Sequence, residues 1–502
     1  MDDSIPIIVG VGRVTRRTTD VAELTEPADL IASAARMAAE DGGLTLSQLA
    51  GIDRIDIIKV MSWPYLDVAT TVAAMLGATG ASCQVSPTGG DQPVALLSRA
   101  ATELRERRAT MVLVAGGEAL HARKVHRLAG SRVSWSGRAP GPSTFARATG
   151  MSDLARRHGL TEPAFVYPLF EQARRARVDA TPRIGQRRSA AIQARLSEVA
   201  VRTPGAWLRH EFSADEIAAA GPHNRWVSWP YTKYMCANPT VDQAAALILT
   251  TVGQARTWGL DLRRAIHLWS DGSAAEPLDV LSRPDLSDSQ ALRTALQTTV
   301  ERAGLEPSEI DLHEFYSCFP VVPWMAADAL GLPLDRETSV AGGLTFFGGP
   351  ANAYIACATV VMVERLRGSP NGTFGLVHGN GLYATRHRAI VLANVEAPRS
   401  WEAAPDDLAS GVPLVREARV DGAISHVVVE TSTVIADSDG QLTRGVAVCR
   451  TPKDSRVVAR IAGETLDLFT DLDHHSVGLT GRVEEASESG ELVFWPDGGR
   501  RL

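Results

Sequence analysis

The sequence of 502 residues is poor in cysteine and in long apolar runs. Its five cysteines are odd in number and scattered without a Cys-x-x-Cys pair, which predicts neither a disulfide framework nor a metal site and fits a reducing compartment. No apolar run reaches the length of a membrane span, and the chain does not begin with a basic segment followed by a long apolar one. We therefore expect no membrane span, no secretion signal and a cytoplasmic location.

An excess of positive charge is also lacking. The net charge is −7 and the isoelectric point is near 6.0, so the overall charge gives no reason to expect nucleic acid or an anionic membrane as a partner. Hydrophobic residues make up 45% of the chain and charged residues 22%, which is typical of a soluble globular protein. The length predicts two or three domains.

Two stretches of the chain alternate strand-like and helix-like patterns in the same order. The first covers residues 5–118 and includes a fully apolar strand at 111–115; the second covers 265–395. This alternation predicts an α/β fold with a mostly parallel sheet. The helix ends Gly43-Leu44 and Gly304-Leu305 resemble each other, which indicates an internal duplication whose halves share one core.

The remaining segments differ in pattern. Residues 119–241 are rich in arginine and turns, and their length predicts an inserted domain with its own structure. After about residue 400, short alternating strands around the hairpin signal Asp439-Gly440 predict a small all-β domain, plausibly a barrel. The predicted boundaries are 1–118 with 242–262 for the first half, 119–241 for the insertion, 263–398 for the second half and 408–502 for the β domain.

Two motifs identify a resemblance to a known family. Asn238-Pro-Thr-Val-Asp242-Gln-Ala-Ala-Ala resembles the Asp-Gly-Ala-Ala-Ala run of thiolases, and Gly116-Gly117-Glu118 resembles their Gly-Gly-x-Glu. The chain is most similar to sterol-carrier-protein-type thiolases and their type-1 thiolase-like relatives, which also carry an additional C-terminal domain. The resemblance implies the layered α/β/α/β/α thiolase fold, with an inserted loop domain and a C-terminal all-β domain.

The four catalytic positions of thiolases fall on unexpected residues. The resemblance places the nucleophilic cysteine at Gly89, the oxyanion-hole side chain at Tyr316, the histidine at Gly349 and the acid/base cysteine at Val377. None of these residues can replace the thiol or imidazole chemistry of a thiolase. We therefore expect no thiolase or ordinary acetyl-CoA acetyltransferase mechanism, although the family itself consists of acyltransferases of lipid metabolism.

The glycine turns around these positions are retained. They allow the pantetheine arm of coenzyme A (CoA) to approach the backbone closely, so CoA or acyl-CoA is the predicted ligand, with no cofactor or metal required. Arg123 and Arg138 are candidates for the CoA phosphates, as the loop domain has this role in thiolases; the alternative is a solvated basic face. The glycines predicted to bind the ligand are Gly89, Gly90, Gly348, Gly349, Gly379 and Gly381.

Three side chains are candidates for a different chemistry. Tyr316, Tyr383 and His378 are candidate acid/base groups; the alternative for Tyr316 is a plug of the old oxyanion hole, and for His378 a structural histidine. Three functions remain open: a non-catalytic acyl-CoA-binding protein, a cysteine-independent retro-aldolase acting on a β-hydroxyacyl-CoA, and a scaffold. The aldolase hypothesis predicts that the Tyr316 and Tyr383 hydroxyls converge in an open cleft. The β domain is a possible protein-binding surface, and the sequence does not decide between monomer and homodimer.

Overall fold

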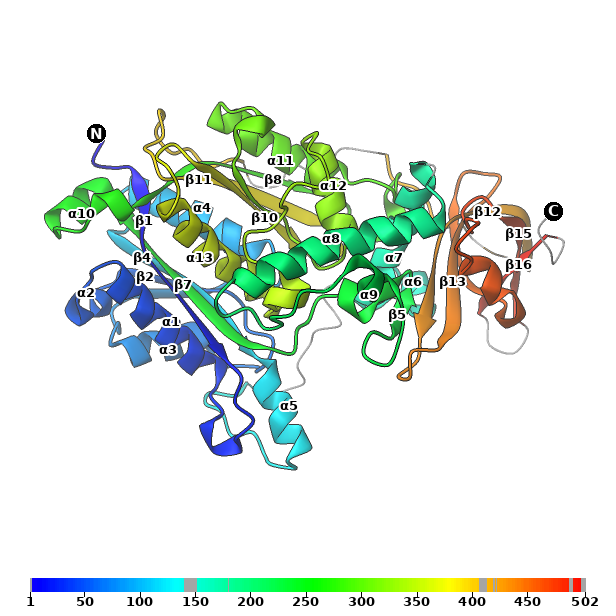
Figure 1. The fold of residues 1–502 in the computed structure, drawn as a ribbon, viewed down its shortest axis with the longest axis horizontal. Helices are drawn as coiled ribbons and strands as arrows, with labels where there is room; N and C mark the ends of the chain where they lie inside the picture. Colours follow the sequence, from blue (N-terminus) through cyan, green and yellow to red (C-terminus); the bar gives the residue numbers. More distant parts are fainter. Residues whose placement is uncertain are drawn as a thin grey trace.

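The computed structural model describes residues 2–139, 151–178, 180–405, 413–418, 420, 422–486 and 491–497 (Figure 1). The first residues of the predicted β domain, 408–412, and both chain ends lie outside the described residues. Within the described ranges, no helix is both long enough and apolar enough to cross a bilayer.

The two predicted halves form one nine-stranded sheet. In spatial order the strands are β3 (Ser82–Val85), β2 (Arg54–Ile57), β4 (Met111–Ala119), β7 (Asp242–Thr251), β1 (Pro6–Arg16), β8 (Ile266–Ala275), β11 (Arg386–Ala393), β10 (Phe374–Gly381) and β9 (Leu312–Glu314). The order β2-β4-β7-β1 of the first half corresponds to β9-β10-β11-β8 of the second, the first half has β3 in addition, and the two parts of the sheet pair where Ile7 and Ile8 lie opposite His267 and Ile266.

The prediction of a mostly parallel sheet was wrong. Parallel pairing is confined to β2 with β3, β2 with β4, and β9 with β10, whereas the strands in the middle of the sheet pair antiparallel. The antiparallel strands β7 and β11 are almost fully buried, as are the parallel ones. Burial on both faces gives an apolar run in either direction, so the pattern alone did not reveal the strand direction.

Helices cover the sheet in the layered order that the resemblance implied. Helices α4 (Gln92–Arg105) and α13 (Tyr354–Arg367) contact each other and strands of both half-sheets, so they form the central layer (Figure 1). One outer layer contains α1 (Pro27–Asp41), with α2 (Leu46–Ala50) and α3 (Val68–Leu76) beside it, and the other contains α11 (Gln290–Ala303) and α12 (Val321–Ala329). The short α10 (Val252–Thr257) follows β7.

The duplication is visible in the backbone as well. Gly43 has φ +69° and Gly304 has φ +71°, so equivalent outer helices are each followed by a glycine in the left-handed region. Helix α11 begins at the N-cap Ser289, whose hydroxyl accepts from the Leu292 amide, and α3 begins similarly at Asp67.

The inserted segment is largely helical. It contains α5 (Leu120–Leu128), α6 (Asp153–Arg157), α7 (Pro163–Arg177), α8 (Pro182–Arg202) and α9 (Ala214–Ala218), followed by the short strands β5 (Trp226–Trp229) and β6 (Tyr231–Thr232). Strand β5 pairs with the C-terminal strand β12, so the insertion and the C-terminal domain share a sheet. This sharing was not anticipated from the sequence.

The C-terminal strands form the predicted barrel-like domain. They are β12 (Ala423–Ala436), β13 (Leu442–Arg450), β14 (Arg456–Ile461), β15 (Thr480–Glu485) and β16 (Leu492–Pro496). Their order is β13-β14-β16-β15-β12, and β12 pairs again with β13, which closes the sheet on itself. The Gly440 turn between β12 and β13 has φ +86°, as a tight hairpin signal predicts.

Buried arginines join the barrel to the thiolase-like body. Arg456 forms an ion pair with Glu430 inside the barrel and donates to the backbone carbonyls of Leu281 and Arg283. Arg283 is itself 2% exposed and donates to the Tyr383 carbonyl at 3.0 Å and to the Ala384 carbonyl at 2.8 Å. The barrel thus supports the turn between β10 and β11, which borders the predicted site.

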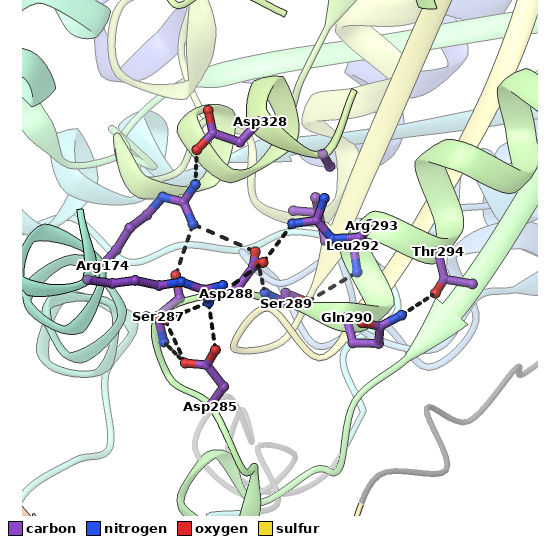
Figure 2. Close-up of polar contacts among 12 residues, drawn as sticks. Arg174, Asp285, Ser287, Asp288, Ser289, Gln290, Leu292, Arg293, Thr294 and Asp328 are labelled. Carbon is purple, nitrogen blue, oxygen red and sulfur yellow. Dashed lines mark hydrogen bonds and ion pairs between the residues drawn. The ribbon is translucent and has the colours of Figure 1, made fainter. Parts of the chain in front are cut away.

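A second polar junction fastens α7 to the start of α11. Figure 2 shows Asp288 between Arg174 and Arg293, with Asp328 on the other side of Arg174. Arg174 also donates to the Ser287 carbonyl at 2.9 Å. Because Arg174 is nearly buried, this junction fixes the insertion against the second half.

Candidate functional site

Three glycine-containing segments and the segment of Tyr316, all distant in sequence, meet at one place. The Gly89 amide, between β3 and α4, donates to Asn352 Oδ1 at 3.0 Å. Gly90 lies against the Tyr316 ring and the Asn380 carbonyl, so closely that an added Cβ would come within 2.6 Å of the Tyr316 hydroxyl. Gly379 packs on the Asp91 backbone. We call this meeting point the glycine-loop centre; it contains the segments 85–92, 314–318, 348–352 and 377–381.

A side chain at Gly89 would have to displace two charged neighbours. Its φ is +153°, and a Cβ at this position would overlap the Asp91 carboxylate and the Arg386 guanidinium. A cysteine in this backbone would collide with both groups. The position at which the resemblance places the thiolase nucleophile is therefore filled by an ion pair.

That ion pair is the main charged feature of the glycine-loop centre. Asp91 is fully buried, with Arg386 at 3.2 Å and Arg388 at 3.7 Å from its carboxylate oxygens. The Gln92 side-chain amide donates to Asp91 at 2.8 Å, and Arg386 also donates to the Thr88 carbonyl. Burial raises the pKa of Asp91 while the two arginines oppose the rise, so its carboxylate is held by its neighbours instead of facing solvent.

The two candidate tyrosines have different partners. The Tyr383 hydroxyl donates to the Thr161 carbonyl at 2.7 Å, and its side chain is 1% exposed. The Tyr316 phenol packs against Gly90 and stands edge-on to Tyr354, with ring centroids 5.9 Å apart. Burial raises the pKa of Tyr316 above its ordinary value. Neither phenol is arranged as a ready proton acceptor.

His378 belongs to a buried chain of polar groups. Its Nε2 lies 3.1 Å from His387 Nδ1, and His387 Nε2 lies 3.4 Å from the Ser289 hydroxyl, which donates to Glu276 at 3.0 Å. Both histidines are fully buried, and burial lowers the pKa of His378 to about 3 and that of His387 well below its ordinary value. At neutral pH the pair is uncharged, and it connects the strand of Gly379 to the start of α11.

The remaining predicted positions are packed into the interior. Val377 is buried in β10 between Ile390 and Glu314 of the neighbouring strands. Gly348 has φ +114° and approaches Gln243, whose amide donates to the Phe347 carbonyl at 2.9 Å. Gly349 donates from its amide to the Asn238 carbonyl, and Gly381 lies against the Asp91 carboxylate.

The two predicted phosphate ligands, Arg123 in α5 and Arg138 in the segment after it, lie against the loop that follows β2. Arg123 donates to the Ser62 carbonyl at 2.9 Å, and Arg138 lies over the Trp63 ring at 5.7 Å. Both side chains are exposed. The same loop is held by Glu118, which accepts from the Met61 and Ser62 amides at 2.7 Å, and burial raises the pKa of Glu118 to about 7.

Sequence reasoning missed Arg386 and Arg388 as parts of the site. They are two residues apart on one strand, so they point to the same face of the sheet, and this alternation was the available signal. Asn352 was also missed, although its side chain joins Gly89 to the Lys59 carbonyl.

Two cavities of the molecule lie elsewhere. One of about 350 Å³ is lined by barrel residues, among them Arg460, Glu464 and Trp495. The other, of about 160 Å³, lies between α8 and the segment around Glu337. Neither is lined by a residue of the glycine-loop centre.

Comparison with known proteins shows what the chain is similar to. No protein-family model matches the sequence. An alignment 211 residues long is 26% identical to sterol carrier protein 2 of Oryctolagus cuniculus and covers 36% of this chain. The match spans only 37% of the length of that relative.

Solved structures cover more of the chain. A monomeric SCP2-thiolase-like protein type 1 from Mycobacterium smegmatis superimposes with a TM-score of 0.82 and 25% identity, over 99% of this chain and 100% of that one. The Acat5 thiolase of Ascaris suum in complex with coenzyme A gives a TM-score of 0.56 at 15% identity, over 78% of this chain and 100% of that one. The Ltp2-ChsH2(DUF35) aldolase gives a TM-score of 0.58 at 15% identity, over 78% of this chain and 99% of that one. The last two likenesses show the fold alone.

Proposed function

Because this chain is a thiolase-superfamily protein of the SCP2-thiolase-like kind, we propose that it binds CoA or an acyl-CoA without thiolase chemistry. The observation that carries the proposal is the closed Gly89 position, where the Asp91–Arg386 ion pair occupies the space that a nucleophilic thiol would need. The fold is kept while the reacting group has no room.

The cysteines of the chain support the absence of covalent chemistry. Attack on a thioester requires a thiolate, and a thiolate requires a thiol with a pKa near or below neutral pH. Burial raises the pKa of all five cysteines. The pKa of Cys318, which lies in the glycine-loop centre, is raised to about 12, and its sulfur accepts from the Asn380 side-chain amide at 3.9 Å. None is therefore an activated nucleophile at neutral pH.

The retained loop geometry supports ligand binding. Glycine turns let a ligand approach backbone amides without side-chain obstruction, and a related fold is known in complex with coenzyme A. In this proposal the pantetheine arm lies along the exposed side of the turn at Pro87 and Thr88. The nucleotide end then points toward the exposed basic surface that includes Arg123 and Arg138.

The aldolase hypothesis receives less support from the geometry. Retro-aldol cleavage needs a proton acceptor at the substrate hydroxyl. Tyr383 already donates to the Thr161 carbonyl, and Tyr316 is packed against Gly90 with a raised pKa. Likeness of fold to an aldolase does not supply the missing acceptor.

Two assays test the proposal together. In the first assay the intact chain is mixed with a 3-ketoacyl-CoA and CoA, and thiolysis is followed. The mass of the protein is then measured to detect a covalent acyl group. We expect neither thiolysis nor an acylated protein. Equilibrium dialysis with CoA is expected to show saturable binding with a Kd in the micromolar range, corresponding to about −8 kcal/mol, that weakens as salt is raised. Turnover that is lost in Cys318→Ser would overturn the non-catalytic part. Absence of CoA binding at millimolar concentration would overturn the binding part and favour a scaffold.

A further inference from the structure

Helix α5 carries an exposed basic face that also contains a leucine. Arg127 and Leu128 follow Lys124 by three and four residues, so the three side chains lie beside one another on the helix surface, with Cβ atoms about 5–6 Å from that of Lys124. All three are exposed, and Leu128 is 74% exposed. We call these three residues the α5 face. Figure 1 shows α5 at the periphery of the molecule.

The opposite side of α5 is anchored, so the α5 face is held toward solvent. Ala122, Val125 and His126 are buried. The Ala122 amide donates to both carboxylate oxygens of Asp242 at 3.0 Å, and His126 Nδ1 lies 2.9 Å from the Ser131 hydroxyl beyond the end of the helix. Because both ends of α5 are fixed in this way, the α5 face can meet a partner without rearrangement of the helix.

The positive charges of the α5 face have no partner within the part of the chain that the structure describes. There, neither Lys124 nor Arg127 forms an ion pair or a side-chain hydrogen bond. The turn that packs on α5 contributes two acids, Asp20 and Glu23, and both accept hydrogen bonds from neighbouring residues of their own segment. The third acid on a packed element, Asp242, is buried and caps the start of α5.

The surrounding sequence adds further positive charge. It contains no acidic residue between Glu118 and Asp153, and Arg132, just beyond the helix, is also exposed. Arg123 and Arg138 are exposed as well, but they border the path proposed for the nucleotide end of CoA, so the α5 face is defined without them. The excess of positive charge is local, and the overall charge of −7 therefore did not predict it.

An exposed leucine among cations distinguishes between kinds of partner. A free anion or the phosphates of a nucleic acid would pair with Lys124 and Arg127 but would leave Leu128 in water. An anionic lipid surface offers headgroup phosphates to the cations and an apolar layer beneath them to the leucine. Neither of the two cavities described above is lined by a residue of α5, so the α5 face matches a broad surface and not a compact ligand.

We propose that the α5 face docks the protein on a membrane surface that contains anionic phospholipids. The binding is peripheral and reversible. Each cation near such a surface strengthens binding about fivefold, and Leu128 adds a similar factor when part of its side chain enters the apolar layer. The proposal is independent of CoA binding, because neither the α5 face nor its partner involves CoA.

The test is cosedimentation of the intact chain, without CoA, with vesicles of equal parts phosphatidylcholine and phosphatidylglycerol and with vesicles of phosphatidylcholine alone. We expect binding to the anionic vesicles, at least about tenfold weaker binding to the neutral ones, and loss of binding as salt is raised. Lys124→Gln combined with Arg127→Gln is expected to weaken binding to the anionic vesicles about 25-fold, and Leu128→Ser about fivefold.

Matched controls remove the same groups elsewhere. Arg187→Gln combined with Lys453→Gln removes two exposed cations, and Leu46→Ser removes a leucine that is 73% exposed on α2. Each control is expected to change vesicle affinity less than about twofold, because its side chain lies outside the α5 face. An equal loss in the controls, or no binding of the wild type to anionic vesicles, would overturn the proposal.

A comparison of the variants identifies the partner. If the double variant loses binding and Leu128→Ser does not, the lipid assignment is wrong and the face contacts a polyanion such as nucleic acid. Arg127 lies in the last turn of α5, where a cation favours the helix dipole, so the melting curves of all variants are recorded. Where Arg127→Gln lowers the melting temperature, Lys124→Gln alone decides, with an expected loss of about fivefold.

Discussion

The glycine-loop centre and the basic surface at Arg123 and Arg138 hold charge in opposite ways. In the centre, the Asp91 carboxylate is buried and matched by Arg386 and Arg388 from one strand. At the basic surface, Arg123 donates to the Ser62 carbonyl, Arg138 lies over the Trp63 ring, and both side chains are exposed. The charges of the centre thus stabilise the structure, whereas the exposed guanidinium groups remain accessible from solvent.

Removing Asp91 tests the structural side of this contrast most severely. In Asp91→Ala the two arginines lose their buried partner, so we expect a loss of about 3 kcal/mol in the free energy of unfolding, measured with urea. We place the value at the low end for a buried pair because the Arg386 side chain is 27% exposed. Asp91→Asn keeps the shape and one acceptor, so it should lose less. An alanine variant as stable as the wild type would show that the ion pair does not support the centre.

Introducing a side chain at Gly89 tests whether the centre is really full. Gly89→Ala and Gly89→Cys both place a Cβ against Asp91 and Arg386, and each is expected to cost about 2 kcal/mol of unfolding free energy. Gly43→Ala is the control, because its φ is also positive but no atom lies within 4 Å of the added Cβ. It should cost about 1 kcal/mol. Thiolysis by Gly89→Cys, without loss of stability, would contradict the closed site.

The buried histidine pair predicts a dependence of stability on pH. Its pKa values in the folded state lie below the unfolded value, so the unfolded chain takes up protons first as the pH falls. The contribution of the two histidines to the free energy of unfolding is fully present above about pH 6.5. It is lost as the pH falls toward the folded pKa of His378, about 3, by up to about 1.4 kcal/mol per pH unit for each histidine.

A variant separates this effect from that of the buried acids. Burial raises the pKa of Glu118 and of Glu314 to about 7. Their contribution to the free energy of unfolding therefore changes in the opposite direction: it falls as the pH rises from their unfolded pKa toward 7. His378→Gln should therefore flatten the acid side of the unfolding profile between pH 6.5 and 4. The exposed His223→Gln serves as the control and should leave it unchanged. If wild type and His378→Gln had identical profiles of unfolding free energy against pH, the buried histidine pair would not be the source of the acid sensitivity.

The smallest expected effect concerns the arginines first predicted as phosphate ligands. Arg138→Gln should weaken CoA binding about threefold or less, because its guanidinium is exposed, rests on Trp63 and is screened by salt. Arg107→Gln, at an exposed turn, is the control. An equal loss of CoA affinity in Arg138→Gln and in Arg107→Gln would show that the surface at Arg138 does not hold the nucleotide end.

The sequence predicted most of the elements because their patterns are local. The short alternating strands after residue 400 predicted the barrel-like domain, and the signal Asp439-Gly440 predicted the turn between β12 and β13. Strand β4 was expected to end near 115, but Gly116 and Gly117 continue in it because β7 pairs along its whole length. The strand directions, and the pairing of β5 with β12, arise from contacts between distant segments and have no local signal.

The site was predictable in its backbone but not in its side-chain pairing. The glycine frames indicated correctly that segments around 89, 316, 349 and 379 come together. The sequence did not reveal the ion pair of Asp91, because its partners Arg386 and Arg388 lie almost 300 residues later. Likewise, the partner of His378 became identifiable only when β10 and β11 were seen to pair.

The central claim is that the chain binds acyl-CoA and leaves it unchanged, and calorimetric titration with acetyl-CoA tests it in one measurement. The account predicts saturating heats of binding that return to the baseline after every injection. Either a continuing heat of turnover after each injection, or no heat of binding at all at millimolar ligand, would contradict it.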